Sequence, residues 1–152
     1  MIELHPIGYV RGGRADPIDD DWGDVEASIE LDAAQFEADV TAGLSDFSHL
    51  DVVYVFHLVK QEKIETAARH PRGRADWPLV GIFAQRAKGR PNRIGVTTCE
   101  IVAVDGLSVR VRGLDAIDGT PVLDLKPYMD ELAPRTEVRE PLWARELMAG
   151  YW

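Results

Sequence analysis

Short runs of alternating apolar and polar residues recur along the chain. In residues 25–31 every second side chain is apolar, which is the period of a strand that buries one face. Residues 50–59 are rich in β-branched and aromatic side chains, which is typical of a central strand. Residues 94–104 and 107–111 flank Asp105-Gly106, a dipeptide that favours a tight hairpin turn.

Three further apolar segments, residues 2–10, 81–84 and 120–125, are predicted as short strands. Short helices are expected from Ala33 to about Val40, after Asp32 as a cap, and over Pro141–Ala149. Several short strands with little helix predict an all-β fold, a barrel or a sandwich with short helical additions. The 152 residues fit a single domain, with a core over about residues 5–130 and a short C-terminal tail over 131–152.

Charge divides the chain into three parts. The net charge is −9, yet residues 60–112 carry 11 basic and 5 acidic side chains, while both flanking parts are acidic. A protein that coats nucleic acid would be basic overall, so the sequence excludes that class. A local basic face made by the middle part stays possible, and solubility alone explains the acidic parts. Residues 60–77, polar and rich in Arg, Gly and Pro, are predicted to form a long excursion from the core.

Cysteine content and hydropathy limit the class of protein further. Cys99 is the single cysteine, so no internal disulfide forms, and its apolar surroundings predict a small buried residue. No N-terminal segment resembles a signal peptide, and no apolar run approaches the roughly 20 residues that cross a bilayer. We therefore expect a cytoplasmic protein without membrane contact.

The segment from Gly81 to Gly95 concentrates donors on a loop. Four cationic side chains within eight residues are interleaved with Gly89, Pro91 and Asn92, which favour turns: Arg86, Lys88, Arg90 and Arg93. Donors on a rigid loop suit an anionic or carboxylate-bearing ligand. The alternative is a solvated basic hairpin loop.

Other polar groups are weaker signals when each is taken alone. His49 and His57 are expected at opposite ends of one strand, and no Cys/His cluster has zinc spacing, so we expect no metal. The loop Leu114–Pro121 offers two carboxylates for hydroxyl or amino groups, or is simply good turn chemistry. The segment Asp124–Tyr128 places a lysine and a tyrosine around a proline that ends a strand.

Taken in order, these groups form a recognisable pattern. The chain resembles the TsaA-like (YaeB-like) family of S-adenosylmethionine-dependent methyltransferases over about residues 5 to 130. The motifs that carry the resemblance are Pro6-Ile7-Gly8, Phe47-Ser48-His49, Phe56-His57, Gly81-Ile82-Phe83-Ala84 with Arg86, Arg90-Pro91-Asn92 with Ile94-Gly95, Leu114-Asp115 with Asp118-Gly119-Thr120-Pro121-Val122, and Asp124-Leu125-Lys126-Pro127-Tyr128.

The resemblance implies a barrel-like β domain, a homodimer with S-adenosylmethionine near the subunit contact, and methylation of N6 of threonylcarbamoyladenosine beside the tRNA anticodon. It also implies a cofactor site. Its residues are His57, Leu58, Arg86, Val96, Asp115, Ala116, Ile117 and Asp118, with Asp20, Asp21 and Trp22 where the family has Pro-Arg-Gln. This chain has no arginine in that last segment, and Gln85 stands where the family has threonine.

Residues near this site supply candidates for catalysis and RNA binding. Asp118, Lys126 and Tyr128 are predicted to act on the methyl acceptor as bases or polarising groups. Any tRNA contact is predicted from the basic middle part, through Arg72, Arg74, Lys88, Arg90 and Arg93. Two alternatives stay open: a methyltransferase for a small molecule, and a module that binds S-adenosylmethionine without turnover.

Overall fold

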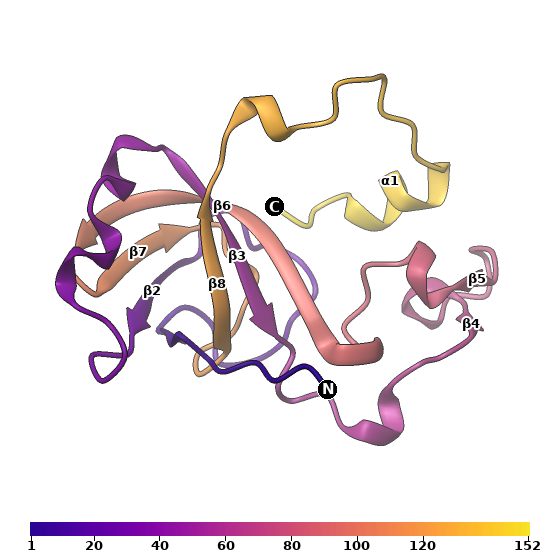
Figure 1. The fold of residues 1–152 in the computed structure, drawn as a ribbon. Coiled ribbons are helices and arrows are strands. Elements are labelled where there is room, and N and C mark those ends of the chain that lie inside the picture. The colour runs from indigo at the N-terminus through magenta and orange to yellow at the C-terminus, as the bar shows by residue number, and fades with distance from the viewer.

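A six-stranded antiparallel barrel forms the body of the protein (Figure 1). The computed structural model describes residues 1–152. Around the barrel the strands follow the order β1-β2-β7-β6-β3-β8, and a separate pair, β4-β5, lies outside it. The strands are β1 (Gly8–Arg11), β2 (Glu26–Leu31), β3 (His49–Val55), β4 (Ala68–Arg69), β5 (Val80–Gly81), β6 (Ile94–Asp105), β7 (Ser108–Arg112) and β8 (Pro121–Pro127).

Helical structure is confined to short additions. The one α-helix is α1 (Leu142–Met148), close to the prediction from Pro141 onward. The 3-10 helices are Ala38–Thr41, Leu44–Asp46, Gln61–Lys63, Pro71–Gly73, Ile82–Ala84, Pro91–Arg93 and Asp130–Leu132. The all-β barrel with short helical additions is therefore confirmed.

The core of the barrel is made by the inward-facing side chains of strands in which apolar and polar residues alternate. Val10, Ile29, Val52 and Val109 are fully buried, and Cys99 is buried among them as predicted. Each fully buried aliphatic side chain stabilises the fold by roughly 1.5–3 kcal/mol. The two-residue period of each strand thus determines which side chains are buried in the barrel core.

The predicted β6–β7 hairpin is confirmed, with its turn shifted by one residue. Asp105 pairs with Ser108, so Gly106 and Leu107 form the turn. Gly106 has a φ of 56°, which a residue without a side chain adopts without steric cost. The glycine is therefore the residue that makes this tight connection possible.

Three predictions about local structure were wrong. Residues 81–84 form the end of β5 and a 3-10 turn in which only Ile82 is buried, because β5 pairs only with the short β4. Residues 33–35 form a turn, and only Ala38–Thr41 is helical, as a 3-10 helix; Asp32 does cap the turn, accepting from the Ala34 amide at 2.9 Å. Residues 2–7 precede β1, which begins only at Gly8.

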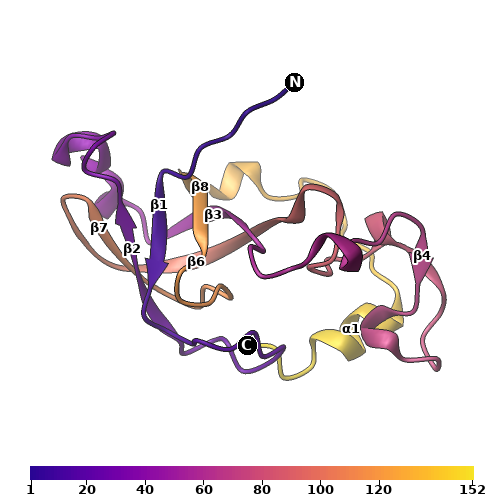
Figure 2. The same ribbon diagram turned by 90° about the horizontal axis from the view of Figure 1, so that it is seen from below.

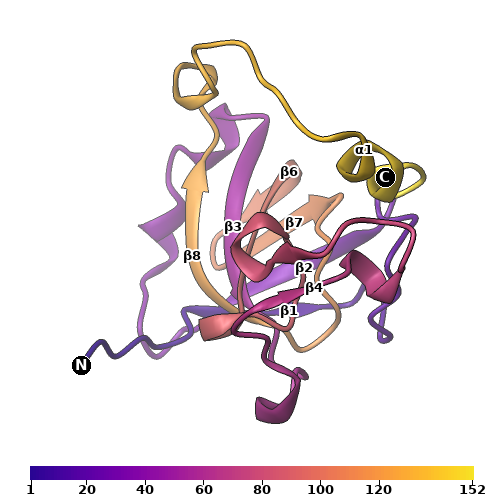
Figure 3. The same ribbon diagram turned by 90° about the vertical axis from the view of Figure 1, so that its right-hand side faces the viewer.

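The excursion after β3 leaves the barrel as predicted and meets the C-terminal tail. Figures 1 and 2 show α1 beside β4 and β5, away from the barrel. The indole N–H of Trp77, a buried residue of the excursion, donates to Oε2 of Glu146 in α1 at 2.8 Å. The chain then turns back toward the barrel, as the view in Figure 3 also shows. No helix is long and apolar enough to cross a membrane.

Candidate active site

A pocket opens at the end of the barrel where β3 finishes. Its volume is about 180 Å³ and most of its lining is apolar. The lining residues are Pro17, Trp22, Tyr54, Val55, Phe56, His57, Leu58, Val59, Lys88, Asp115, Ala116, Ile117 and Thr120. The pocket therefore joins the end of β3 to the loop before β8 and to the acidic loop before β2, residues 16–23.

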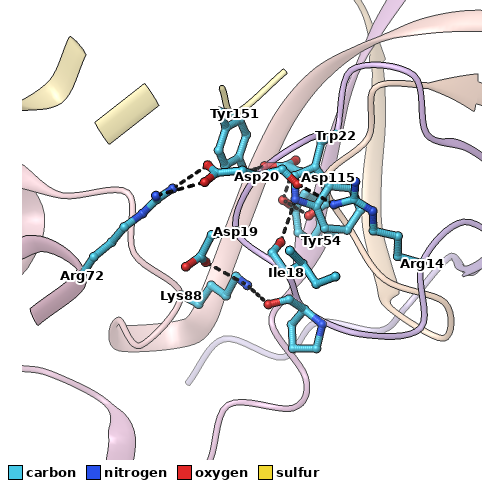
Figure 4. Close-up of polar contacts among 11 residues, drawn as sticks. Arg14, Ile18, Asp19, Asp20, Trp22, Tyr54, Arg72, Lys88, Asp115 and Tyr151 are labelled. Carbon is cyan, nitrogen blue, oxygen red and sulfur yellow. Dashed lines mark hydrogen bonds and ion pairs between the residues drawn. The ribbon is translucent and has the colours of Figure 1, made fainter. Parts of the chain in front are cut away.

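The carboxylate of Asp115 is the polar centre of this pocket (Figure 4). Its Oδ1 accepts hydrogen bonds from the hydroxyls of Tyr54, at 3.0 Å, and Thr97. Its Oδ2 accepts from the hydroxyl of Tyr151. No ion pair of the structure includes Asp115. A negative charge is thus held by neutral donors and has no cationic partner.

Both tyrosines act on Asp115 as donors. Burial, and then the nearby charge of Asp115, raises the pKa of Tyr54 well above its ordinary value. The same two causes raise the pKa of Tyr151. Each phenol therefore keeps its proton at neutral pH, and neither tyrosine is a base for the chemistry of this pocket.

Gly95 makes room for the aromatic wall of the pocket. Tyr54 and Phe56 pack edge to face with ring centroids 5.4 Å apart. Gly95 lies opposite Tyr54 on β6, and a Cβ added there would lie 2.8 Å from both rings. A side chain at this position would push Tyr54 away from Asp115.

The acidic loop forms the wall opposite β3. Trp22 is 2% exposed, and its indole N–H donates to the carbonyl of Ile18 at 2.9 Å. The guanidinium of Arg14 lies 4.5 Å from the centre of the Trp22 ring. Arg14 also donates to the carbonyls of Asp20 and Asp21. These contacts fix the loop that stands where the family has Pro-Arg-Gln.

Cations from the basic middle part reach the same loop. The guanidinium of Arg72 pairs with Asp20 at 3.1 Å, and Nζ of Lys88 lies 3.9 Å from Asp19 (Figure 4). Lys88 also donates to the carbonyl of Pro17 at 3.4 Å. The segment Asp20–Trp22 has no arginine of its own, and Arg72 and Lys88 bring positive charge to this loop from other parts of the chain.

The structure brings together part of the predicted cofactor site. Asp20 and Asp21 lie in the loop that holds Trp22, while Asp118 accepts from the Gly12 amide at 2.9 Å outside the pocket lining. Six predicted residues line the pocket itself: Trp22, His57, Leu58, Asp115, Ala116 and Ile117.

Arg86 and Val96 lie outside the pocket lining. Arg86 donates to the backbone carbonyl of Val96 at 3.0 Å, and the Val96 side chain is 43% exposed. The next residue, Thr97, points inward to Asp115. Arg86 and Val96 are therefore not among the residues that line the pocket, although the charge of Arg86 acts on Tyr54, where it opposes the rise in pKa.

Two of the predicted catalytic residues lie nearer the opposite end of the β3–β8 pair. Lys126 pairs with Asp51 in the register, roughly 10 Å along β3 from Tyr54, and the Tyr128 amide bonds to the carbonyl of His49. A hydrogen bond and the charge of Asp124, 2.9 Å away, raise the pKa of Lys126. Burial, and then the charge of Asp130, raises the pKa of Tyr128. Both side chains keep their protons at neutral pH.

All five residues predicted to contact RNA also make contacts within the protein. Besides Arg72 and Lys88, Arg74 pairs with Asp76 at 2.5 Å. Arg90 donates to the carbonyl of Gln85 at 2.6 Å, and Arg93 to that of Val59 at 2.7 Å. These side chains therefore shape the loops beside the pocket, and the last two are mainly structural donors.

Sequence reasoning missed several residues of the site. Tyr54 and Thr97 occupy inward positions of strands that were predicted, so the alternating pattern could have pointed to them. Arg14 and Tyr151 gave no such signal, because only tertiary folding brings their segments to Trp22 and Asp115. No group of three or more His, Cys, Asp and Glu is placed to hold a metal ion.

Most of the chain matches the model of a known protein family. The model of the tRNA-methyltransferase O N-terminal domain matches residues 16–133, which include every residue that lines the pocket. The chain belongs to this family. Family membership confirms the resemblance seen in the sequence, and the tail after residue 133 lies beyond the matched part.

Relatives of known description fall into two groups. A probable S-adenosyl-L-methionine-binding protein of Methanothermobacter thermautotrophicus is 35% identical, over 86% of this chain and 93% of its own length. The tRNA (adenine(37)-N6)-methyltransferase of Escherichia coli is 38% identical over 66% of this chain, and the human enzyme of that name 39% over 66%. This chain matches only 44% and 22% of those two proteins.

A solved structure shows the same fold. The crystal structure of TrmO from Pseudomonas aeruginosa superposes with a TM-score of 0.72 at 25% identity. The match covers 93% of this chain and 62% of that one. The barrel and its additions are therefore shared almost completely.

Proposed function

We propose that this protein is an S-adenosylmethionine-dependent methyltransferase that methylates N6 of adenine 37 in tRNA, where the base carries a threonylcarbamoyl group. The observation that carries the proposal is the pocket centred on Asp115, which lies inside the part of the chain that matches the family. The descriptions of the relatives support both the cofactor and the acceptor. A tRNA substrate also fits the cytoplasmic location expected from the sequence.

The residues of the pocket fit S-adenosylmethionine. The carboxylate of Asp115, which has hydrogen-bond donors but no ion-pair partner, suits the ammonium group or the ribose hydroxyls of the cofactor. Lys88 lines the pocket on the opposite wall and suits the cofactor's carboxylate, and the apolar side chains of Phe56 and Ile117 suit the adenine ring. When bound, the cofactor supplies an electrophilic methyl group on its sulfonium.

The protein's part in such a transfer is chiefly positioning. Methyl transfer needs the acceptor nitrogen in line with the carbon–sulfur bond, and an apolar pocket excludes water from that line. Deprotonation of N6 falls to a carboxylate in our proposal, because Lys126 and Tyr128 keep their protons. Asp118 is the only carboxylate among the predicted catalytic residues, and it directly follows Ile117 of the pocket lining.

We also propose a homodimer as the working unit. Exposed apolar side chains lie close to Arg86 in the sequence: Leu79 is 62% exposed and Phe83 80%. Such a surface favours contact with a second copy of the chain. In the dimer, Arg86 and Val96 serve a pocket at the subunit contact, and Lys126 and Tyr128 act there as polarising donors.

The proposed tRNA contact uses the basic residues next to the acidic loop. Lys88 lines the pocket, Arg72 reaches Asp20 of the acidic loop from the excursion, and Arg74 lies two residues after Arg72; each forms an ion pair with an aspartate. Binding of RNA phosphates would compete with these aspartates. We therefore expect modest affinity that falls steeply with salt.

Two measurements test the proposal. Calorimetric titration with S-adenosylmethionine and its demethylated product should show binding of both. Transfer of a labelled methyl group should then occur to tRNA that lacks this methylation. Binding without transfer to any RNA or metabolite pool would favour a binding module, and transfer only to small molecules would favour the alternative acceptor class.

A further inference from the structure

The tail beyond the family match returns to the pocket and is held there by specific contacts. The amides of Asp21 and Trp22 donate to the carbonyls of Gly150 and Tyr151 at 3.1 and 2.8 Å. Tyr151 and Trp152 pack edge to face, with ring centroids 4.8 Å apart. Two adjacent backbone hydrogen bonds thus hold the tail against the acidic loop.

Two features outside the tail suit this arrangement. A Cβ added to Gly23 would lie 2.8 Å from the backbone carbon of Trp152, so the absence of a side chain at position 23 lets the tail approach. Farther back, Trp77 holds Glu146 of α1 at 2.8 Å. The excursion and the acidic loop therefore fix the tail at two points on either side of Tyr151.

The tail brings one functional group into the site, the hydroxyl of Tyr151. It donates to Oδ2 of Asp115 (Figure 4), whereas the hydroxyls of Tyr54 and Thr97 donate to Oδ1. A carboxylate offers about four lone-pair positions. Three are occupied here, so the Tyr151 contact fixes the rotation of the carboxylate and leaves one position for a ligand.

We propose that Tyr151 is a positioning residue of the S-adenosylmethionine site, which orients the Asp115 carboxylate toward the cofactor. The inference rests on the proposed function, because it assumes that the pocket binds this cofactor. Tyr151 need not touch the cofactor itself, and its effect on binding passes through Asp115. The tail is then part of the site, although it lies outside the part of the chain that matches the family.

A double-mutant cycle separates positioning from simple support of the fold. Tyr151→Phe keeps the ring and its packing and removes only the hydroxyl. It should weaken S-adenosylmethionine binding about 10-fold, since the carboxylate then has one hydrogen bond fewer to hold its orientation. In an Asp115→Asn background the same change should have almost no further effect, because the group it positions is already altered. Tyr9→Phe, on β1 away from the pocket, is the control and should leave affinity unchanged.

Gly23→Ala tests the same idea through the backbone. The new methyl group should displace the tail, speed hydrogen exchange at the Trp22 amide and weaken cofactor binding about as much as Tyr151→Phe does. Unchanged exchange at Trp22 would show that the tail does not dock as described and would overturn the inference.

The affinities for S-adenosylmethionine measured by calorimetry separate failure of the positioning role from failure of the proposed function. Equal losses from Tyr151→Phe in the wild-type and Asp115→Asn backgrounds, or no loss at all, would overturn the positioning role while wild-type binding still supports the proposed function. Failure of the wild-type protein to bind S-adenosylmethionine would instead overturn the proposed function and the cofactor role of Tyr151 with it.

Discussion

The hydroxyl of Tyr54 lies 3.0 Å from Oδ1 of Asp115, a residue 61 positions later in the chain. Tyr54 comes from the inward face of β3, and Asp115 from the loop that precedes β8. Their contact places a carboxylate at the closed end of an apolar pocket, with hydrogen-bond donors but no cation beside it. That environment favours a cationic or hydroxyl-bearing ligand over an anionic one.

Replacement of the carboxylate should therefore affect ligand binding more than folding. Asp115→Asn keeps the size of the side chain and its acceptor oxygen for Tyr54 and Thr97, but removes the charge. We expect S-adenosylmethionine binding to weaken by about 1.5–3 kcal/mol, as for removal of a charged hydrogen bond. Calorimetry measures this, with Asp46→Asn at an exposed position as the control. Wild-type affinity in a folded Asp115→Asn protein would show that the ligand does not use the carboxylate.

Gly95→Ala should disturb the contact between Tyr54 and Asp115, because the new methyl group would press on the Tyr54 ring. The added Cβ would lie 2.8 Å from the Tyr54 and Phe56 rings, inside the barrel, so we expect stability to fall by about 1–3 kcal/mol and cofactor binding to weaken. Gly81→Ala is the matched control, because nothing lies within 4 Å of its new Cβ. Urea denaturation compares the two variants, and equal stability would argue against the tight packing described for Tyr54.

The raised pKa values of the tyrosines predict how stability changes in alkaline solution. In the unfolded chain both phenols lose protons near their ordinary pKa of 10.0, whereas in the folded protein burial raises the pKa of Tyr54 and Tyr151. The folded state therefore binds more protons above that pH, and stability must fall as pH rises past about 10. Denaturation measured from about pH 8 to about pH 11 should show a shallower fall in the Tyr54→Phe, Tyr151→Phe double variant.

Cys99 should be inert toward thiol reagents in the folded protein. It is 3% exposed, and burial, followed by the charge of Asp115, raises the pKa of its thiol to about 12. Only the thiolate reacts, so labelling at neutral pH should be slow until denaturant is added. Rapid labelling of the native protein would indicate that the barrel opens near β6.

Salt dependence of tRNA binding should identify the basic surface. Replacement of Arg72, Arg74 and Lys88 by alanine removes the three cations of the proposed tRNA contact. The slope of log affinity against log salt should become shallower by about 0.7–0.9 for each phosphate that the variant no longer neutralises. We also expect weaker binding at low salt. The control replaces Arg135 and Arg139, two exposed cations of the acidic C-terminal part, and should leave the slope unchanged.

Strand positions could be predicted from sequence where alternation is complete. Residues 25–31 and the β6–β7 hairpin show this, since one buried face and one glycine turn leave little choice of structure. Residues 81–84 look equally apolar, yet they have no long partner strand and become a turn. Apolar composition alone could not reveal that missing partner.

Prediction of the site was limited by long-range contacts. Motif resemblance found Asp115 and His57, which line the pocket. It also grouped Arg86 with them, although Arg86 does not line the pocket and donates to the carbonyl of Val96. Tyr151 could not be found, because its role depends on a tail that folds back over the barrel end.

The most direct test of the proposed activity is methyl transfer to a defined position in RNA. Purified protein is supplied with labelled S-adenosylmethionine and tRNA that carries the threonylcarbamoyl group but lacks the methyl group, and the labelled nucleoside is located after digestion. We predict label on N6 of adenine 37, no label in tRNA with another base at that position, and little label with Asp115→Asn. Binding of the cofactor with no label in tRNA, or label that persists when adenine 37 is replaced, would contradict this activity.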